Sequence, residues 1–202
     1  MYALPKPEAF ERMRGEDQRP LLIVRECGRC KGDDAFLSRT LANDKTLLLS
    51  QWFHCVKLKQ HVISEDHTFH RLFEGEMPPH LLLATADGST ILPLPGDQSQ
   101  TKLWEAMFKI LKLEYRRDAK RAFKDLQQLL SQYDHLDSME DQYLEQIDVE
   151  IEKRGPRSSK LKTLRKKLAI IGEKKKATAE REKKIVDLGL KRAEKAAAKK
   201  PG

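Results

Sequence analysis

The first 115 residues alternate short apolar runs with polar connections, and this pattern predicts several strands. Residues 21–24 form a continuous apolar run that is too short for a helix, which is typical of a strand buried on both faces. Residues 52–58 alternate near their end and predict a second strand. Residues 81–85, followed by Asp87-Gly88, predict a β-hairpin whose second strand covers 90–92.

Helices are predicted between these strands, and the order of the elements indicates the fold class. Residues 33–42 have an apolar face and carboxylates in their first turn, and Asn43-Asp44 ends this helix. A second helix is expected over 64–73. Pro93, Pro95 and Gly96 are expected to end the hairpin, and Ser99 caps a third helix. The order strand, helix, strand, helix, hairpin, helix predicts an α/β domain with a mixed sheet.

Beyond residue 115 the apolar residues recur at three- and four-residue steps, which is the periodicity of a helix with a narrow apolar stripe. The residues in this stripe are Leu126, Leu129, Tyr133, Leu136, Tyr143, Leu144, Ile147, Ile151, Leu161, Leu164, Leu168 and Ile171. Gly155-Pro156 is the strong helix breaker between its two halves, so we predict a helical hairpin or coiled coil hinged near 155–156. The expected organisation is an N-terminal arm (1–17), an α/β domain (18–115) and a charged helical extension (116–202).

Charge changes the picture of this extension. Charged residues make up 35% of the chain, and the net charge is +8. Residues 134–152 contain no Lys or Arg, whereas Lys and Arg dominate from Lys153 onward. We expect the acidic arm to face the basic arm. Such asymmetry is typical of a segment that binds a partner protein or pairs with itself.

The basic arm also raises the alternative of nucleic-acid binding. No aromatic residue interleaves its cations, so base stacking is not expected and nucleic acid is the less favoured partner. The apolar stripe is too thin for a membrane-surface helix, and no apolar run approaches the roughly 18 residues of a membrane span. Residues 1–8 lack the apolar region of a signal peptide. We expect a cytoplasmic protein with no membrane partner.

The candidate chemistry lies directly after the first predicted strand, in Cys27-Gly28-Arg29-Cys30. Two thiols two residues apart, where a strand leads into a helix, indicate a redox site in an intracellular chain. Cys27 would be the nucleophile, because a helix N-terminus and the neighbouring cations favour its thiolate. Cys30 would resolve the mixed disulfide. No cofactor is needed for this exchange.

Two alternatives for the cysteine pair depend on its neighbours. The pair could be structural, or it could supply half of a closed zinc site together with His54 and Cys55. His54 and Cys55 are adjacent on a predicted strand, and their side chains therefore point to opposite faces. We expect no metal, and we expect Cys55 to be a small buried apolar residue in the sheet.

These motifs resemble the thioredoxin family. Cys27-Gly28-Arg29-Cys30-Lys31 is similar to the family's Cys-Gly-Pro-Cys-Lys, and Pro79 with three following leucines before Asp87-Gly88 is similar to its second conserved segment. The resemblance covers roughly residues 18–113. It implies a thioredoxin-like fold, a cis peptide bond at Pro79, and a substrate groove formed by Pro79, Gly28 and Arg29. Glu26 and Arg29 stand where the family usually has tryptophan and proline.

Two functions follow from these expectations. The first is a protein-disulfide oxidoreductase in which Cys27 attacks a protein substrate and Cys30 resolves the intermediate. The second is a non-catalytic scaffold of the same fold whose helical arm binds a partner protein. The sequence has no Gly-rich phosphate loop, no Gly-x-Ser-x-Gly and no His-Glu-x-x-His. Their absence argues against nucleotide hydrolysis, serine esterase chemistry and metalloprotease chemistry.

Overall fold

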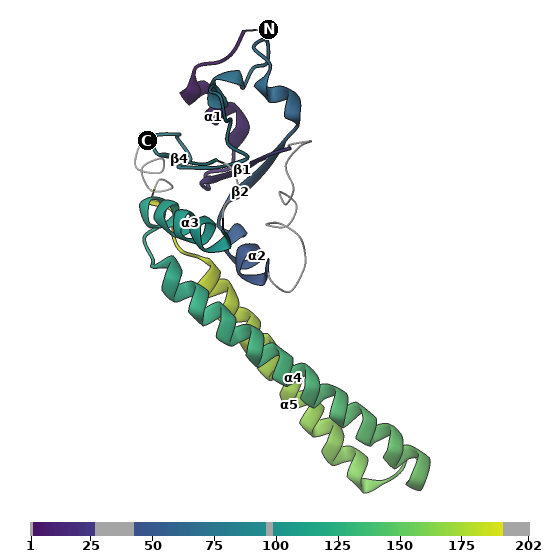
Figure 1. Cartoon of the computed structure of the whole chain (residues 1–202). Coiled ribbons are helices and arrows are strands. Elements are labelled where there is room, and N and C mark those ends of the chain that lie inside the picture. The colour runs from purple at the N-terminus through teal and green to yellow at the C-terminus, as the bar shows by residue number, and fades with distance from the viewer. Residues whose placement is uncertain (1, 27–42, 96–98, 192–202) are drawn as a thin grey trace. The chain divides into compact units, whose positions relative to one another are not determined.

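The computed structural model describes residues 2–26, 43–95 and 99–191. The chain divides into two compact units (Figure 1). The first comprises residues 1–120 together with the segment from Leu188 onward, and the second comprises residues 121–187. The predicted helix over 33–42 lies outside the described residues.

The first unit is a mixed α/β structure. Its described α-helices are α1 (Lys6–Arg14), α2 (Asp44–Ser50) and α3 (Gln100–Glu114). Its described strands are β1 (Leu21–Arg25), β2 (His54–Leu58), β3 (Leu81–Ala84) and β4 (Ile91–Leu94). Two short 3-10 helices, η3 (Gln60–Ile63) and η4 (His70–Leu72), connect β2 to β3.

The four strands form one sheet in the order β2-β1-β3-β4. β1 pairs in parallel with β2, from Leu21 opposite His54 to Arg25 opposite Leu58. β3 pairs antiparallel with both β1 and β4. The apolar run that forms β1 is buried on both faces as predicted, because β1 is a central strand covered on each side.

Two layers of helices cover the sheet, with α1 on one face and α2 and α3 on the other (Figure 1). Leu21 and Ile23 belong to a buried cluster that includes Phe10 of α1. Leu22 points to the opposite face by the period of two along a strand, and α3 contributes buried Met107 there. Successive side chains of β1 therefore pack into two apolar cores, one on each face of the sheet.

The hairpin between β3 and β4 confirms the prediction made from Asp87-Gly88. Gly88 has a φ of 68°, and its amide donates to the Thr85 carbonyl over 2.8 Å. Asp87 Oδ1 accepts from the Thr85 hydroxyl and from the Ser89 amide. A Cβ at Gly88 would lie 2.3 Å from Cδ2 of Phe10, so this turn also requires glycine for close packing.

Two local predictions were wrong. The expected helix over 64–73 is a series of turns with bonds three residues apart, such as His70 N to His67 O at 3.0 Å. Pro93, expected with Pro95 and Gly96 to end the hairpin, instead pairs with Leu82 within β4, which is possible because β4 is an edge strand. The helix expected to end at Asn43-Asp44 lies outside the described residues, and Asp44 begins α2. The Ser99 cap of α3 is confirmed, since its side chain accepts from the Lys102 amide.

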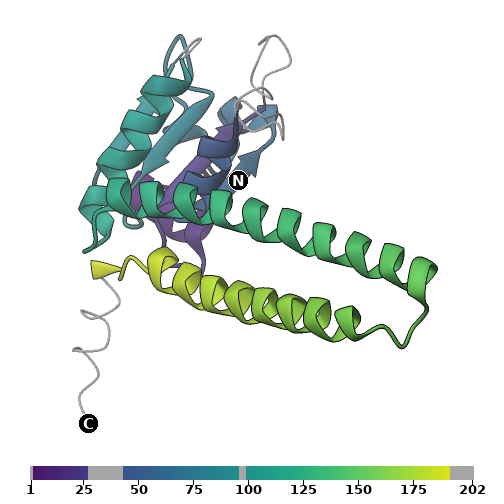
Figure 2. The same cartoon turned by 90° about the horizontal axis from the view of Figure 1, so that it is seen from below.

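The second unit contains most of α4 (Ala119–Arg154) and α5 (Ser159–Val186), which lie side by side as a hairpin (Figure 2). Gly155, with a φ of 77°, follows the last residue of α4, and its amide donates to the Ile151 carbonyl. Buried or half-buried residues recur at alternating three- and four-residue steps, which is the seam of an antiparallel coiled coil. They are Ala122, Leu126, Leu129, Tyr133, Leu136, Glu140, Tyr143, Ile147 and Glu150 of α4, and Leu161, Leu164, Leu168, Ile171, Lys175, Thr178, Glu182 and Ile185 of α5.

Polar residues interrupt this seam in matched positions. Lys175 of α5 forms ion pairs with Asp137 and Glu140 of α4. The Tyr133 hydroxyl donates to Glu182 over 3.0 Å. Such pairs fix the register of two helices, because a shifted register would leave each polar group against an apolar one. None of the described helices combines the length and the apolar character that a membrane crossing requires.

Candidate functional site

Some of the predicted site residues belong to the described part of the chain and others do not. Cys27, Gly28, Arg29 and Cys30 lie outside the described residues. Pro79 and the chain up to Glu26 lie within them. The structure therefore defines the surroundings from which the cysteine segment leaves the sheet.

The chain reaches this segment at the carboxyl end of the parallel strand pair. The Arg25 amide donates to the His80 carbonyl, and the Glu26 amide donates to the Leu58 carbonyl, both over 2.8 Å. Glu26 is thus held between β2 and the chain entering β3, one residue before Cys27. The carboxyl edge of parallel strands is where α/β sheets commonly place their functional groups.

Arg25 is the most distinctive residue at this edge, because its charged side chain is only 4% exposed. Its guanidinium donates to the carbonyls of Pro78 (3.1 Å), Pro79 (3.3 Å) and Glu26 (3.2 Å). Nη2 also lies 3.0 Å from Nδ1 of His80. Since a guanidinium can only donate, Nδ1 of His80 accepts, and the neutral ring carries its proton on Nε2. One buried cation thus joins the end of β1 to residues 78–80.

Pro79 differs from the expectation in its backbone. No cis peptide bond occurs among the described residues, so the bond preceding Pro79 is trans and the predicted cis bond is wrong. The carbonyls of Pro78 and Pro79 both point to Arg25 in this arrangement. Pro79 also lines a hollow of about 300 Å³, together with Lys6, Leu72, Glu74, Met77, Leu82, Ile91, Pro93 and Pro95.

The charges near this edge are partly compensated. Lys57 Nζ lies 3.2 Å from Glu26 Oε1, and both side chains are exposed. The hydrogen bonds of Arg25 within the described residues go to three backbone carbonyls and to an imidazole. A buried cation favours a nearby anion, such as a thiolate, more strongly than an exposed one does.

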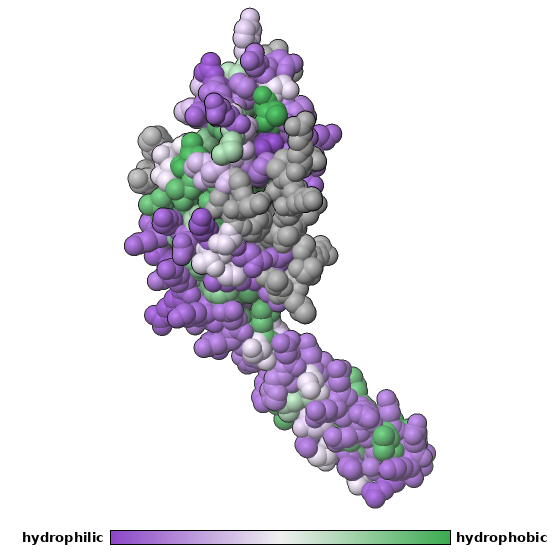
Figure 3. Space-filling model, in the orientation of Figure 1, coloured by the Kyte–Doolittle hydropathy of each residue, from purple (hydrophilic) through white to green (hydrophobic). Residues whose placement is uncertain are grey.

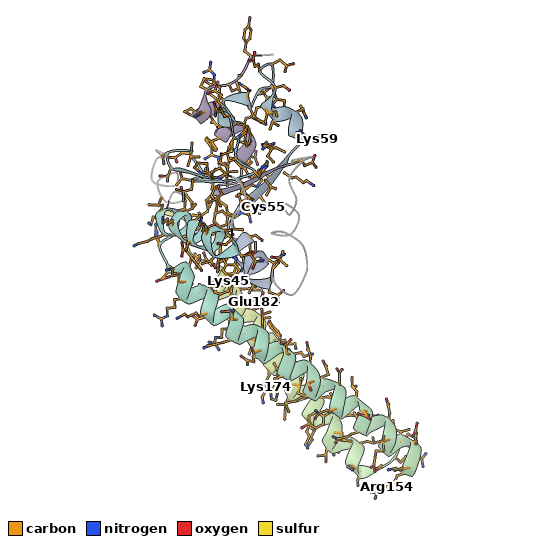
Figure 4. All side chains as sticks on the ribbon, in the orientation of Figure 1. Lys45, Cys55, Lys59, Arg154, Lys174 and Glu182 are labelled. Carbon is orange, nitrogen blue, oxygen red and sulfur yellow. The ribbon has the colours of Figure 1, made fainter. Side chains whose placement is uncertain are left out.

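Cys55 is exposed on the edge strand β2, so its predicted burial was wrong (Figure 4). It shares a face with Lys57 by the period of two, and among the described strands only β1 pairs with β2. Its sulfur nevertheless lies against the backbone, 3.8 Å from the Ser50 carbonyl oxygen. This desolvation raises the pKa of the Cys55 thiol, and Arg19 opposes the effect. Cys55 is therefore a weak nucleophile at neutral pH.

His54, the other residue of the zinc alternative, is engaged elsewhere. Its Nδ1 lies 3.0 Å from Oδ2 of Asp17. Arg19 hydrogen-bonds the same carboxylate and, as the main cause, lowers the pKa of Asp17 to about 2. No group of three or more His, Cys, Asp or Glu side chains suited to a metal occurs in the part of the chain that the structure describes.

The sequence analysis missed two sets of polar contacts, those of the buried Arg25 side chain and the pairing of Asp17 with His54. Arg25 carries a sequence signal, since a cation closes an apolar strand immediately before the cysteine motif. The pairing of Asp17 with His54 carries none, because the two residues are far apart in the chain and meet only when β1 and β2 align.

Comparison of the chain with protein-family models, with curated proteins and with solved structures gives no significant match. The assignment of a function therefore depends on the residues and their geometry.

Proposed function

We propose that this protein is a thiol–disulfide oxidoreductase of the thioredoxin type, which exchanges a Cys27/Cys30 dithiol for a disulfide on a protein substrate. The observation that carries the proposal is the position of Glu26, which is hydrogen-bonded to β2 at the carboxyl edge of the parallel pair, one residue before Cys27. The sheet order β2-β1-β3-β4, with a parallel first pair and an antiparallel hairpin, supports it.

The exchange needs only the two thiols and the substrate. The Cys27 thiolate attacks one sulfur of the substrate disulfide, and the other substrate sulfur leaves as a thiolate and takes a proton. The Cys30 thiolate then attacks the Cys27 sulfur in the mixed disulfide and releases the second substrate thiol. Two electrons pass to the substrate, and Cys27 and Cys30 end as a disulfide.

The residues around β1 suit this chemistry. The buried Arg25 cation supports the thiolate form of a cysteine two residues further along the chain. Its bonds to Pro78 and Pro79 hold the segment that enters β3 beside the end of β1. The mostly apolar hollow next to Pro79 is suited to an extended substrate segment, which supports the assignment of Pro79 to a substrate groove.

A redox titration of the full chain tests the proposal. The Cys55→Ser variant is equilibrated in thiol/disulfide buffers, and free thiols are counted by alkylation and mass. We expect one two-electron transition between about −120 and −270 mV, the range of known dithiol oxidoreductases. The Cys27→Ser/Cys55→Ser variant is the matched control and should retain one alkylated thiol, Cys30, without an intramolecular disulfide.

The opposite result favours the scaffold. If no intramolecular disulfide forms at any buffer potential, the oxidoreductase proposal fails. The fold would then serve as a support, and the coiled-coil arm would bind a protein partner. The Leu130 and Leu144 side chains on α4, 45% and 47% exposed, favour this second candidate. Its test is loss of partner binding in a Leu130→Gln/Leu144→Gln variant but not in Cys27→Ser.

A further inference from the structure

The turn of the coiled-coil hairpin concentrates positive charge. Residues 153–172 contain eight Lys or Arg residues and no Asp or Glu. This stretch forms the end of α4, the connecting loop and the first half of α5. Arg154 marks this end of the hairpin in Figure 4. All residues of the hairpin, 121–187, are described.

A buried acid holds the turn in place. Glu150 is 6% exposed and accepts a 2.6 Å hydrogen bond from the Ser158 hydroxyl. Arg154 and Lys160 each place a nitrogen 3.6 Å from its carboxylate. The hydrogen bond from Ser158 is the largest cause of a lowered pKa at Glu150, so the carboxylate is ionised at neutral pH. The turn is therefore a structured support for the surrounding cations.

Four further cations lie together on the connecting loop and the first turns of α5. Arg157, Lys162, Arg165 and Lys166 are exposed and form no ion pair with any residue of the hairpin. They line one shallow hollow of about 470 Å³, whose other lining residues are Pro156, Ser158, Leu161 and Ala169. No acidic residue and no residue of α4 lines this hollow.

The expected neutralisation of the basic arm by the acidic arm is therefore incomplete. The ion pairs between the two helices engage Lys160 and Lys175 of α5, both on the side that faces α4. The acids of residues 134–152 lie on the other helix, so the hairpin has one basic side near its turn. Figure 3 shows that the visible surface of the hairpin is mostly hydrophilic.

We propose that this basic tip, residues 153–169, binds the phosphate backbone of double-stranded nucleic acid without regard to base sequence. Clustered cations that form no ion pair with described residues, such as Arg157, Lys162, Arg165 and Lys166 of this tip, bind phosphates and release condensed counterions. The tip has no aromatic side chain on which unpaired bases could stack, which favours a duplex over a single strand. This activity is separate from the proposed thiol exchange.

A membrane surface fits the tip less well. Helices that lie in a membrane interface need a broad apolar face beside the cations. The apolar face of this part of α5 is already used against α4, where Leu161, Leu164 and Ile171 are 2–3% exposed. The remaining side chains of the hollow are small or polar apart from the cations.

The test is fluorescence anisotropy with labelled DNA and RNA duplexes of about 20 base pairs, roughly two helical turns. The tip variant is Arg157→Gln/Lys162→Gln/Arg165→Gln/Lys166→Gln in the full chain. The matched control, Lys174→Gln/Lys176→Gln/Arg181→Gln/Lys183→Gln, removes the same charge from exposed positions further along α5. Circular dichroism checks that both variants keep the helical content of the parent chain.

We expect the parent chain to bind both duplexes, with affinity falling steeply between about 50 and 200 mM salt. The tip variant should bind at least about tenfold more weakly, and its salt slope should be smaller by about 3–4, since each lost phosphate contact removes about 0.9. The control should lose less than about threefold. The Cys27→Ser/Cys30→Ser variant should bind like the parent, whatever the outcome of the redox titration.

Three results would overturn the proposal. The first is no binding of either duplex at low salt. The second is equal loss in the tip and control variants, which would assign the effect to net charge alone. The third concerns competition with the labelled duplex, with each competitor's concentration counted as its negative charges. If phosphatidylserine vesicles displace the labelled duplex at a lower concentration than unlabelled duplex does, the tip binds a membrane. If polyglutamate does so, the tip binds an acidic protein.

Discussion

Replacing Arg25 tests the arrangement on which the site depends. Arg25→Met keeps an unbranched apolar stem but removes the guanidinium, so four polar contacts of 3.0–3.3 Å are lost and the carbonyls of residues 78 and 79 lose a donor. A hydrogen bond to a charged group contributes about 1.5–3 kcal/mol. These four hydrogen bonds are long, so each contributes toward the lower of these energies. Met also regains some apolar contact with Phe73, whose ring centroid lies 5.9 Å from Cζ of Arg25. We therefore expect a net loss of about 3 kcal/mol in the free energy of unfolding of the first unit.

Urea denaturation followed by tryptophan fluorescence measures this loss. Both tryptophans of the chain, Trp52 and Trp104, belong to the first unit, so the signal does not report on the hairpin. With a slope of about 2 kcal/mol/M, the midpoint should fall by about 1.5 M urea. Arg25→Lys is the matched control: it keeps the charge without the planar fork, and it should cost about 1–2 kcal/mol. The reasoning is refuted if Arg25→Met costs less than about 1 kcal/mol, or if both variants cost the same.

Other substitutions give sharp expectations. Gly88→Ala should cost at least about 3 kcal/mol in urea denaturation of the first unit, because its Cβ would meet the Phe10 ring. Gly155→Ala has a positive φ but open space around its Cβ, and it should cost the second unit about 1 kcal/mol by urea denaturation followed by circular dichroism. Equal costs would contradict the packing argument. Asp17 has a folded pKa of about 2, below its usual 3.8, so its contribution is present above pH 4 and is lost as pH falls toward 2. Because this carboxylate is partly exposed, we expect Asp17→Asn to lower the free energy of unfolding by about 1 kcal/mol at pH 7 and to have no effect near pH 2, as measured by thermal melts. A loss that is the same at both pH values would refute this linkage.

Local signals predicted those elements whose determinants are adjacent in the chain. The run 21–24 is apolar throughout and forms the central strand β1. Asp87-Gly88 supplies a positive φ and a side-chain acceptor, and Ser99 supplies an N-cap, so both turn and cap were confirmed. The hairpin could be predicted because the breaker at Gly155 separates two continuous heptad patterns.

The errors arose where long-range contacts decide the structure. Residues 64–73 contain a capping pattern, but tertiary contacts bury Phe69 partly and Leu72 and Phe73 almost fully, and the backbone adopts turns. Cys55 was expected in the interior because free cysteine is usually a small buried residue, whereas it is exposed on β2, the strand at the edge of the described sheet. The sequence does show Lys57 on the same face, which is the available signal for an exposed surface.

The two proposals are independent because their residues belong to different compact units. Cys27 follows β1 of the first unit, whereas the basic tip belongs to the second. An oxidised chain that binds duplexes as well as the reduced chain would show that the hairpin localises the protein without regulating its chemistry. Different affinities of the two redox forms would instead require a coupling free energy between the units, and linkage then requires that duplex binding shift the reduction potential by the same amount. Measuring the potential with and without duplex therefore decides whether the hairpin is a tether or a regulator.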